Sequence, residues 1–450
     1  MNKRRTEILQ NLCPFIFSLT NIYLCGKISL SNNNLVRNKM TIIEFYDKVA
    51  IENIAGAMLC NADKIILVGD SKKKMERSRA IYQSILDNRG EQATVSHMCI
   101  NRNNLMNIVS VLTEIVNTDE SCIFDLTGGE DLYLVAVGII MNKFEGKIQC
   151  HRFNFINNTL YDCDADGNVC STLPFIISVD ENIGMYGGRI VRDANQPLHT
   201  YGWNIDDDFS RDIELMWEVC KRNTSLWNLN TAILGSLCEK LESEEQLDFD
   251  LDRSAIMPEL EKKKIGFGEY VDFLAEISQL GLIYLRKIND GIAFNFKNAQ
   301  TKRCLTLPGQ ILELIIASRM KQVLDSDGSP LYHDVTVGAV IDWDQNDEAN
   351  RYRTINEIDI LAMKGAIPIF ISCKNGNFDE NELYKLSTVA DRFGDKYAKK
   401  VLIATKLDKF GVKSDYLRAR MNDMNIRCIE NITTANHSQF EAILRSLWFN

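Results

Sequence analysis

The stretch Asn356–Gly376, NEIDILAMKGAIPIFISCKNG, reads as two strands that each carry charged side chains at defined positions. Successive side chains of a strand point to opposite faces, so Glu357 and Asp359 share one face. By the same rule Ser372 and Lys374 share a face at the end of the apolar run IPIFISC. If the two strands pair, two carboxylates and an ammonium group converge.

Such a group suits a hard divalent cation held by oxygen ligands, with the lysine orienting or activating a water for attack on a phosphodiester. Glu313 interrupts the apolar helical run from Ile311 to Ile316 and is a candidate further ligand. A plainer interpretation is that the acids form the solvent face of an edge strand and Lys374 is a strand-end charge. The sequence favours the metal site. Asp342 and Asp344 are weaker candidates, because VIDWD simply ends in a turn.

Length and composition set the class of protein. With 450 residues the chain should form roughly two to four domains, and 45% hydrophobic with 25% charged residues is an ordinary globular composition. The net charge of −10 argues against coating nucleic acid by bulk electrostatics, although a local basic groove is compatible with it. The 13 cysteines lack CxxC pairs, which disfavours zinc and indicates a reducing, cytoplasmic setting. No stretch is long and apolar enough to span a bilayer, so no membrane partner is expected.

The first 39 residues are unlike the rest of the chain. MNKRR followed by ILQNLCPFIFSLTNIYLCG resembles a signal peptide, but it has polar interruptions and no small-x-small cleavage pattern. Met40 opens MTIIEFYDKVA, which reads as folded sequence. We interpret residues 1–39 as an extension upstream of a favoured start at Met40, with a genuine extension or export signal as the alternative.

From Lys64 to residue 156, strands alternate with helices. The strands are KIILVGD, ATVSHMCI, SCIFDL and KIQCHRFNF, and amphipathic stretches separate them. This alternation predicts a Rossmann-like, mostly parallel sheet in residues 40–156, with ligands at the carboxyl ends of its strands.

Two strand-to-helix turns of this region favour a nucleotide-like ligand. FDLTGGED, Phe124–Asp131, has two glycines that permit close approach to the backbone, and free N–H groups at a helix start attract phosphate. VGDSKKKMERS, Val68–Ser78, adds hydroxyl, acidic and basic groups. Neither turn matches GxGxxG or a Walker loop, which disfavours NAD and ATP hydrolysis, and ordinary punctuation between strand and helix is the plainer alternative. The candidate ligand-binding residues are Gly69, Asp70, Ser71, Asp125, Thr127, Gly128, Gly129 and Glu130.

The remaining chain divides at about residue 302. In residues 157–302, helical stretches precede LGLIYLRKINDGIAFNFKN, a predicted hairpin turning at Asn289-Asp290-Gly291, which suggests a winged-helix-like connector. A spacer role is favoured over DNA reading, because the candidate helices carry no dense basic run. Residues 303–450 are predicted to have the order α-β-β-β-α-β, followed by a closing strand and helix from Asn425 to Trp448.

The third region resembles the restriction-endonuclease-like PD-(D/E)xK superfamily. The acid of its second strand maps onto Asp359, its acid-x-Lys motif onto Ser372-Cys373-Lys374, and its helix acid onto Glu313. Ser372 departs from the usual acid, so one ligand must come from Glu357 or a backbone carbonyl. The resemblance implies a Mn²⁺- or Mg²⁺-dependent nuclease, with Asp359, Glu313 and Glu357 as ligands and Lys374, Asp359 and Glu357 in catalysis.

A Rossmann-like region with GDS after its first strand and DLTGG after a later one resembles a CARF domain, the sensor of cyclic oligoadenylates in type III CRISPR immunity. Joined to the nuclease-like region, the chain is similar to CARF-nuclease effectors from Met40 to its end. That resemblance implies a homodimer with one cyclic oligoadenylate, tetra-adenylate favoured, across two CARF domains. It also implies a DNA- or RNA-cleaving nuclease that this ligand activates.

Two alternatives stay open. One is a CARF–winged-helix transcription regulator whose nuclease-like region is degenerate at Ser372, and the other is a ring nuclease that degrades the cyclic ligand in its CARF pocket. A regulator would not need Asp359 and Lys374 on neighbouring strands, so their presence favours the nuclease.

Overall fold

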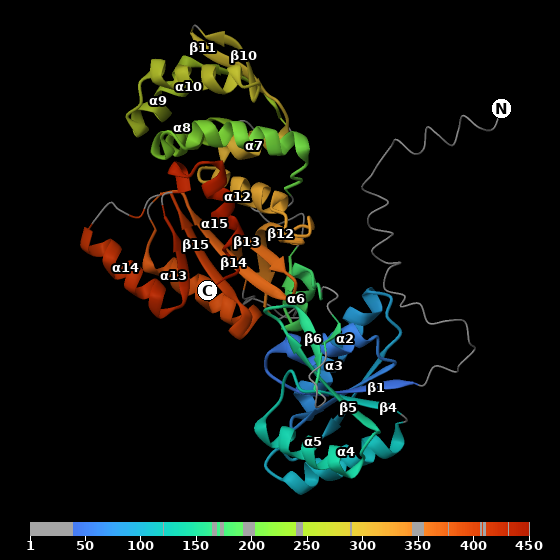
Figure 1. The fold of residues 1–450 in the computed structure, drawn as a ribbon. Coiled ribbons are helices and arrows are strands. Elements are labelled where there is room, and N and C mark those ends of the chain that lie inside the picture. Colours follow the sequence, from blue (N-terminus) through green and yellow to red (C-terminus); the bar gives the residue numbers. More distant parts are fainter. Residues whose placement is uncertain are drawn as a thin grey trace, which may run out of the picture. The chain divides into compact units, whose positions relative to one another are not determined.

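The protein is an α/β chain, as predicted, and its described residues form three sheets (Figure 1). The computed structural model describes residues 39–119, 121–163, 169–171, 175–191, 203–239, 246–288, 290–343, 355–376, 378–405, 407, 411–430 and 432–449. The interpretation of residues 1–38 lies outside this described part. Among the described residues, no helix has the length and hydropathy needed to cross a membrane.

The first sheet has the strand order β3-β2-β1-β4-β5-β6-β7. Strands β1 to β5 pair in parallel, and β6 and β7 extend the sheet antiparallel. The strands are β1 (Met40–Phe45), β2 (Lys64–Gly69), β3 (Thr94–Cys99), β4 (Ser121–Asp125), β5 (Ile148–Asn154), β6 (Thr159–Asp162) and β7 (Val169–Ser171). The helices are α2 (Ala55–Cys60), α3 (Lys72–Asn88), α4 (Leu105–Thr118) and α5 (Asp131–Lys143), with the 3₁₀ turn η1 (Ala50–Asn53).

One strand position in the sequence interpretation was wrong. The GDS turn follows the second strand, β2, because MTIIEF forms the central strand β1 between β2 and β4. Five of the six residues of β1 are buried, as expected for a central parallel strand covered on both faces. Such a strand has no polar-apolar alternation, so its hydrophobic pattern alone does not identify it as a strand.

The second sheet has the order β10-β11-β9. Strands β10 and β11 pair antiparallel, which confirms the predicted hairpin; Asn289 of its turn lies outside the described residues. Between Val179 and Thr306 the elements are α6 (Val179–Met185), β8 (Arg189–Ile190), α7 (Asp207–Cys220), α8 (Thr224–Glu239), β9 (Asp248–Asp252), α9 (Arg253–Lys263), α10 (Phe267–Gln279), β10 (Ile283–Ile288), β11 (Gly291–Phe296) and α11 (Ala299–Thr306), of which β8 pairs with β12 of the third sheet. Buried rings of Phe249, Phe294 and Phe296 pack together in the core of the second sheet.

The third sheet is mixed, with the order β16-β15-β14-β13-β12-β8. Its elements are α12 (Gln310–Gln322), β12 (Asp334–Asp342), β13 (Ile355–Lys364), β14 (Ile367–Lys374), α13 (Glu380–Gly394), η2 (Asp395–Tyr397), β15 (Lys399–Ala404), α14 (Gly411–Asp423), β16 (Ile426–Ile429), η3 (Ile432–Thr434) and α15 (His437–Arg445). The predicted order α-β-β-β-α-β is confirmed. Helix α14 was not predicted; among its residues of described burial, Leu417 and Met421 are the buried hydrophobic ones, too few for a clear helical period.

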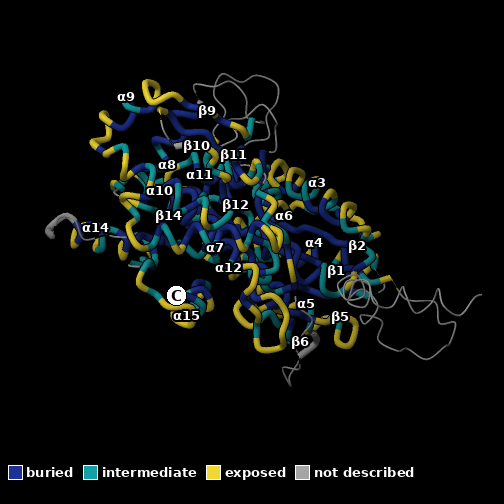
Figure 2. Tube along the Cα trace, turned by 90° about the horizontal axis from the view of Figure 1, so that it is seen from above, coloured by how far each residue is buried: buried dark blue, intermediate teal, exposed yellow. Residues whose placement is uncertain are grey.

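Burial follows this architecture. The sheet strands are mostly buried, whereas exposed residues lie on outer helix faces such as that of α3 (Figure 2). One hydrophobic cluster contains residues of both the first and the third sheet regions, among them Ile42, Phe155, Leu361 and Phe393.

Candidate functional site

Asp359 lies where strands β13 and β14 separate. The ladder pairs Ile360 with Ile371 and continues to the Lys364–Ile367 pair. Beyond the last ladder pair, the Asp359 carboxylate replaces the backbone as the acceptor. Its Oδ2 accepts hydrogen bonds from the backbone N–H of Cys373 at 2.6 Å and from the Ser372 hydroxyl at 3.1 Å. The serine at the usual acid position therefore holds the aspartate.

Lys374 ends β14 between two carboxylates. Its Nζ lies 2.7 Å from Oε2 of Glu382, in the first turn of α13, and 3.7 Å from Oδ2 of Asp359. Burial alone lowers the pKa of Lys374, but the charges of Asp359 and Glu382 outweigh it and raise that pKa. The sequence interpretation missed Glu382; the acidic segment ENEL that opens the helix after ISCKNG was its one signal.

Glu313 approaches the same place from α12. Its carboxylate accepts a hydrogen bond from Gln310 Nε2 at 2.8 Å. Burial raises the pKa of Glu313 well above its ordinary value, and the charges of Asp359 and Glu357 raise it further. The structure thus brings the three acids and Lys374 into one electrostatic neighbourhood. A small pocket there is lined by Glu357, Asp359, Ser372, Glu382 and Lys385, among others.

The chemistry of this pocket suits a divalent cation with few protein ligands. Mutual repulsion of the carboxylates is what a bound cation relieves. Within the described residues, however, no three His, Cys, Asp or Glu side chains are placed to hold one ion together. Mg²⁺ usually binds through one or two carboxylates and keeps several waters, so Asp359 with one further acid of this cluster would meet its requirement without a third close acid.

The carboxyl edge of the first sheet carries a cation that the sequence interpretation missed. Arg102, in the loop between β3 and α4, lies with Nε 3.4 Å from Oδ2 of Asp70 and donates from Nη1 to Oε1 of Glu130 at 3.2 Å. All three residues are exposed and follow the ends of β3, β2 and β4. An arginine inside the asparagine-rich turn NRNN after a strand was the available signal. Ser71 lies at the N-terminus of α3 beside this edge.

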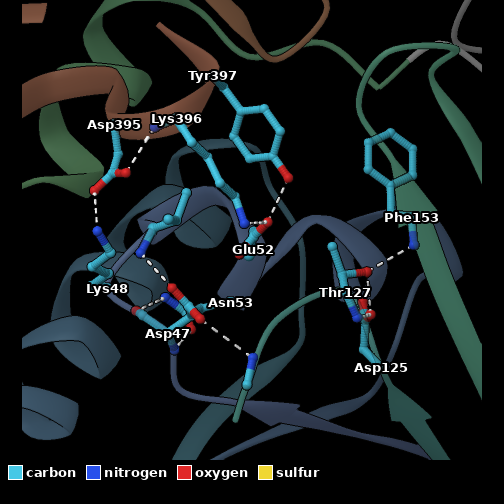
Figure 3. Close-up of polar contacts among 12 residues, drawn as sticks. Asp47, Lys48, Glu52, Asn53, Asp125, Thr127, Phe153, Asp395, Lys396 and Tyr397 are labelled. Carbon is cyan, nitrogen blue, oxygen red and sulfur yellow. Dashed lines mark hydrogen bonds and ion pairs between the residues drawn. The ribbon is translucent and has the colours of Figure 1, made fainter. Parts of the chain in front are cut away.

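The other candidate ligand residues face the interior. Asp125 is only 1% exposed, and its Oδ1 accepts hydrogen bonds from the Thr127 backbone N–H at 2.7 Å and from the Thr127 hydroxyl (Figure 3). Thr127 Oγ1 in turn accepts from the Phe153 N–H at 2.7 Å. Gly69 is buried, and a Cβ there would lie 2.8 Å from Tyr46 Cβ.

Packing explains both glycines of the turn. A Cβ at Gly128 would lie 3.2 Å from the Cβ atoms of Asp47 and Glu52. Gly129 has a φ of 103°, and a Cβ there would lie 2.7 Å from Phe45 Cβ. The turn needs glycine for its own backbone conformation and for what lies behind it.

Asp125→Asn should stabilise the protein at alkaline pH. Burial, followed by the repulsion of Glu52, raises the pKa of Asp125 from 3.8 to about 6. The folded state therefore binds this proton more tightly than the unfolded state, and the associated stability is lost as pH rises through this range. Asparagine keeps an acceptor for Thr127 without the charge, so the free energy of unfolding at pH 8 should rise by on the order of 2 kcal/mol. Urea denaturation at pH 5 and pH 8 measures this, and an unchanged or lower stability at pH 8 would contradict it.

No protein-family model matches the chain, and no curated protein matches its sequence. Solved structures do match it, among them the following two. Protein VC1899 from Vibrio cholerae has a TM-score of 0.67 and 15% identity, covering 91% of this chain and 98% of that one. Can2 from Sulfobacillus thermosulfidooxidans, solved in complex with cyclic tetra-adenylate, has a TM-score of 0.60 and 13% identity, covering 91% of this chain and 100% of that one. Across 91% of its length the chain therefore shares the fold of VC1899 and Can2, the fold that its resemblance to CARF-nuclease effectors implied.

Proposed function

We propose that this protein is a divalent-metal-dependent endonuclease of type III CRISPR antiviral defence, activated by a cyclic oligoadenylate. The observation that carries the proposal is the partly buried pair of Asp359 and Lys374 at the end of two paired strands, with Glu313 of α12 close enough for their charges to shift its pKa. The fold shared with Can2, which was solved with cyclic tetra-adenylate, supports the choice of activator. In this proposal residues 40–156 sense the ligand together with β6 and β7, which extend their sheet; the rest of 157–302 connects, and 303–450 cleave together with β8.

In the nuclease part, Asp359 and Glu313 would hold the cation, with Glu357 as an outer acid. When bound, Mg²⁺ or Mn²⁺ supplies positive charge for the phosphate and acidifies a water. Lys374 keeps its charge and can donate a hydrogen bond to the attacking water or to a phosphate oxygen. Ser372 and the Cys373 N–H fix the Asp359 carboxylate, so that it is already oriented before the substrate arrives.

In the sensing part, phosphate groups of the ligand would bind along the exposed edge. Arg102 is one cation of that edge, and the N-terminus of α3 at Ser71 adds backbone N–H groups. Asp70 and Glu130 hold Arg102 in place and contact the ribose or base groups rather than phosphate. Tetra-adenylate is the favoured ring size.

The turn residues have a different part in this proposal. Asp125 and Thr127 hold the shape of the turn, because their side chains already bond each other and Phe153. Gly128 and Gly129 bring its backbone against the interior. These residues position the edge instead of contacting the ligand with their side chains.

The outer face of α5 supports the proposal of a homodimer. Leu134, Val135 and Ile139, the α5 apolar face, are 43%, 51% and 41% exposed. All three lie on the exposed side of the helix, where the four-residue spacing makes Val135 and Ile139 direct neighbours. Because α5 begins directly after the Gly128-Gly129 turn, a two-fold pairing of this face would bring two ligand edges to one cyclic molecule.

Val135→Glu with Ile139→Glu should therefore produce a monomer. Like charges would face each other across the two-fold axis, which opposes association. Sedimentation velocity measures the mass, and calorimetry should show that cyclic tetra-adenylate binding is lost with the dimer. Ile156→Glu alters an exposed isoleucine outside α5 and is the matched control. A double variant that stays dimeric would place the interface elsewhere.

The residues of the connector argue against the alternative of a DNA-binding regulator. The exposed face of α10, the helix before the β10–β11 hairpin, carries Glu269 and Asp272. Carboxylates at a DNA-reading position repel the phosphate backbone.

The proposal is tested by incubating supercoiled plasmid and single-stranded RNA with the protein, Mn²⁺, and cyclic tetra- or hexa-adenylate. Cleavage or nicking should require both the metal and one cyclic ligand. Chromatography of the same reactions follows the ligand, and its conversion without nucleic acid cleavage would indicate a ring nuclease instead. Absence of cleavage with every combination would overturn the nuclease assignment.

A further inference from the structure

Glu52 joins the two regions that the proposed function separates. It lies in η1 of the sensing part and is only 2% exposed. Its Oε1 accepts a hydrogen bond from the Tyr397 hydroxyl at 2.5 Å and lies 2.7 Å from Lys396 Nζ (Figure 3). Both partners belong to η2, the turn that directly follows α13.

Glu52 also lies directly behind the Gly128-Gly129 turn. The backbone of Gly128 lies so close to Glu52 and Asp47 that a Cβ atom at this position would already be in tight contact with both side chains. The Gly129 N–H donates to Oδ2 of Asp47 at 3.4 Å. Asp47 and Asn53 exchange hydrogen bonds of 2.6 and 2.9 Å, which ties this loop to η1. The turn and the loop that carries Glu52 are therefore in direct contact.

A second route reaches the same tyrosine. Thr127 is bonded to the Phe153 N–H, and the Phe153 ring meets the Phe155 ring edge-on at a centroid distance of 4.8 Å. The Phe155 ring lies 4.5 Å from the Tyr397 ring. The turn thus contacts Tyr397 through packed rings on one side and through Glu52 on the other.

At its opposite end α13 holds the proposed catalytic lysine. Glu382 in its first turn pairs with Lys374 Nζ at 2.7 Å. The helix has 15 residues and spans about 22 Å at the usual rise per residue. One continuous helix therefore has the sensing contact at its C-terminus and the lysine contact at its N-terminus.

We propose that Glu52, Lys396 and Tyr397 form a coupling contact through which the Gly128-Gly129 turn, which positions the ligand edge, sets the position of α13, and that Glu382 passes this position to Lys374. This inference rests on the proposed function and names the regulation of its site. A ligand activates only by binding one arrangement more tightly than another, so the coupling contact must differ between the two arrangements. A buried carboxylate tolerates few geometries, because separating it from its partners leaves an unpaired charge, and this favours two discrete positions over a gradual shift.

Two variants test the contact. Tyr397→Phe removes one hydroxyl, and Glu52→Gln with Lys396→Met removes both members of the ion pair without leaving a buried charge alone. Each should still bind cyclic tetra-adenylate by calorimetry and keep its melting temperature within a few degrees. The ratio of cleavage with ligand to cleavage without it should fall by at least about tenfold, within the usual range of coupling between two sites.

The matched control is Tyr384→Phe. Tyr384 lies on the same helix, is exposed, and bonds Glu380 rather than the sensing part. Its stimulation ratio should equal that of the wild type. Hydrogen exchange provides an independent readout: ligand should alter exchange in residues 380–397 of the wild type and of Tyr384→Phe, but not in the coupling variants.

The outcomes separate the two proposals. If the wild type is stimulated and both coupling variants bind ligand and are stimulated equally, the coupling contact is refuted while the proposed function stands. If the wild type neither binds the ligand nor responds to it, the proposed function fails and the coupling inference falls with it.

Discussion

Asp359→Asn is expected to abolish ligand-stimulated cleavage of plasmid or RNA. Asparagine matches the size of aspartate and keeps one acceptor for the Cys373 N–H and the Ser372 hydroxyl, but it removes the charge that would hold the cation. Losing about 4 kcal/mol of transition-state stabilisation corresponds to about a thousandfold lower rate. Gel assays with Mn²⁺ and cyclic tetra-adenylate measure the loss.

The control for this prediction is Asp423→Asn. Asp423 is an exposed acid at the end of α14 in the same region and pairs with Arg420. The Asp423→Asn protein should cleave at the wild-type rate. Calorimetry of Asp359→Asn should show unchanged binding of the cyclic ligand. If the folded Asp359→Asn protein instead cleaves at the wild-type rate, the nuclease site lies elsewhere.

Arg102→Glu is expected to weaken binding of cyclic tetra-adenylate by at least about tenfold. A hydrogen bond from a charged donor contributes about 1.5–3 kcal/mol, and the reversed charge adds repulsion of the phosphates. Arg102 is exposed and its partners are surface acids, so the fold should persist. The stimulation curve should shift to higher ligand concentration, while the metal-dependent step keeps its maximal rate at saturating ligand.

Arg211→Glu is the matched control for Arg102. Arg211 is an exposed arginine of α7 that pairs with Asp208 in its own helix. Ligand affinity should be unchanged in that variant. The affinity of the wild type should also fall with added salt, because phosphate contacts are screened. If Arg102→Glu binds as tightly as the wild type, the ligand does not use this edge.

Gly128→Val shows how the tertiary structure changes the meaning of a sequence motif. From the sequence, a valine there would block the ligand's approach to the backbone. In the folded chain the added carbons would press on Asp47 and Glu52. That substitution would disturb the coupling contact itself, so it cannot separate ligand binding from activation.

Local sequence by itself determined a large part of the architecture. Alternation along each strand placed Glu357 with Asp359 and Ser372 with Lys374, and turn residues marked the β10–β11 hairpin. Those patterns depend on short-range backbone geometry, which a few neighbouring residues specify. Where a strand is buried on both faces, as in β1, or a helix has little apolar surface, as in α14, the periodic signal is weak and the elements were misplaced or missed.

Only the tertiary structure decided which charged groups meet. Glu52 and Tyr397 are 345 residues apart, and the sequence around either residue does not indicate that the other is its partner. The pairing of Glu382 with Lys374 likewise depends on how α13 packs against β14, and that of Arg102 with Asp70 and Glu130 on the order of three strands. Many surface acids and bases are available in the sequence, and the choice among them is made by long-range packing, which no local period encodes.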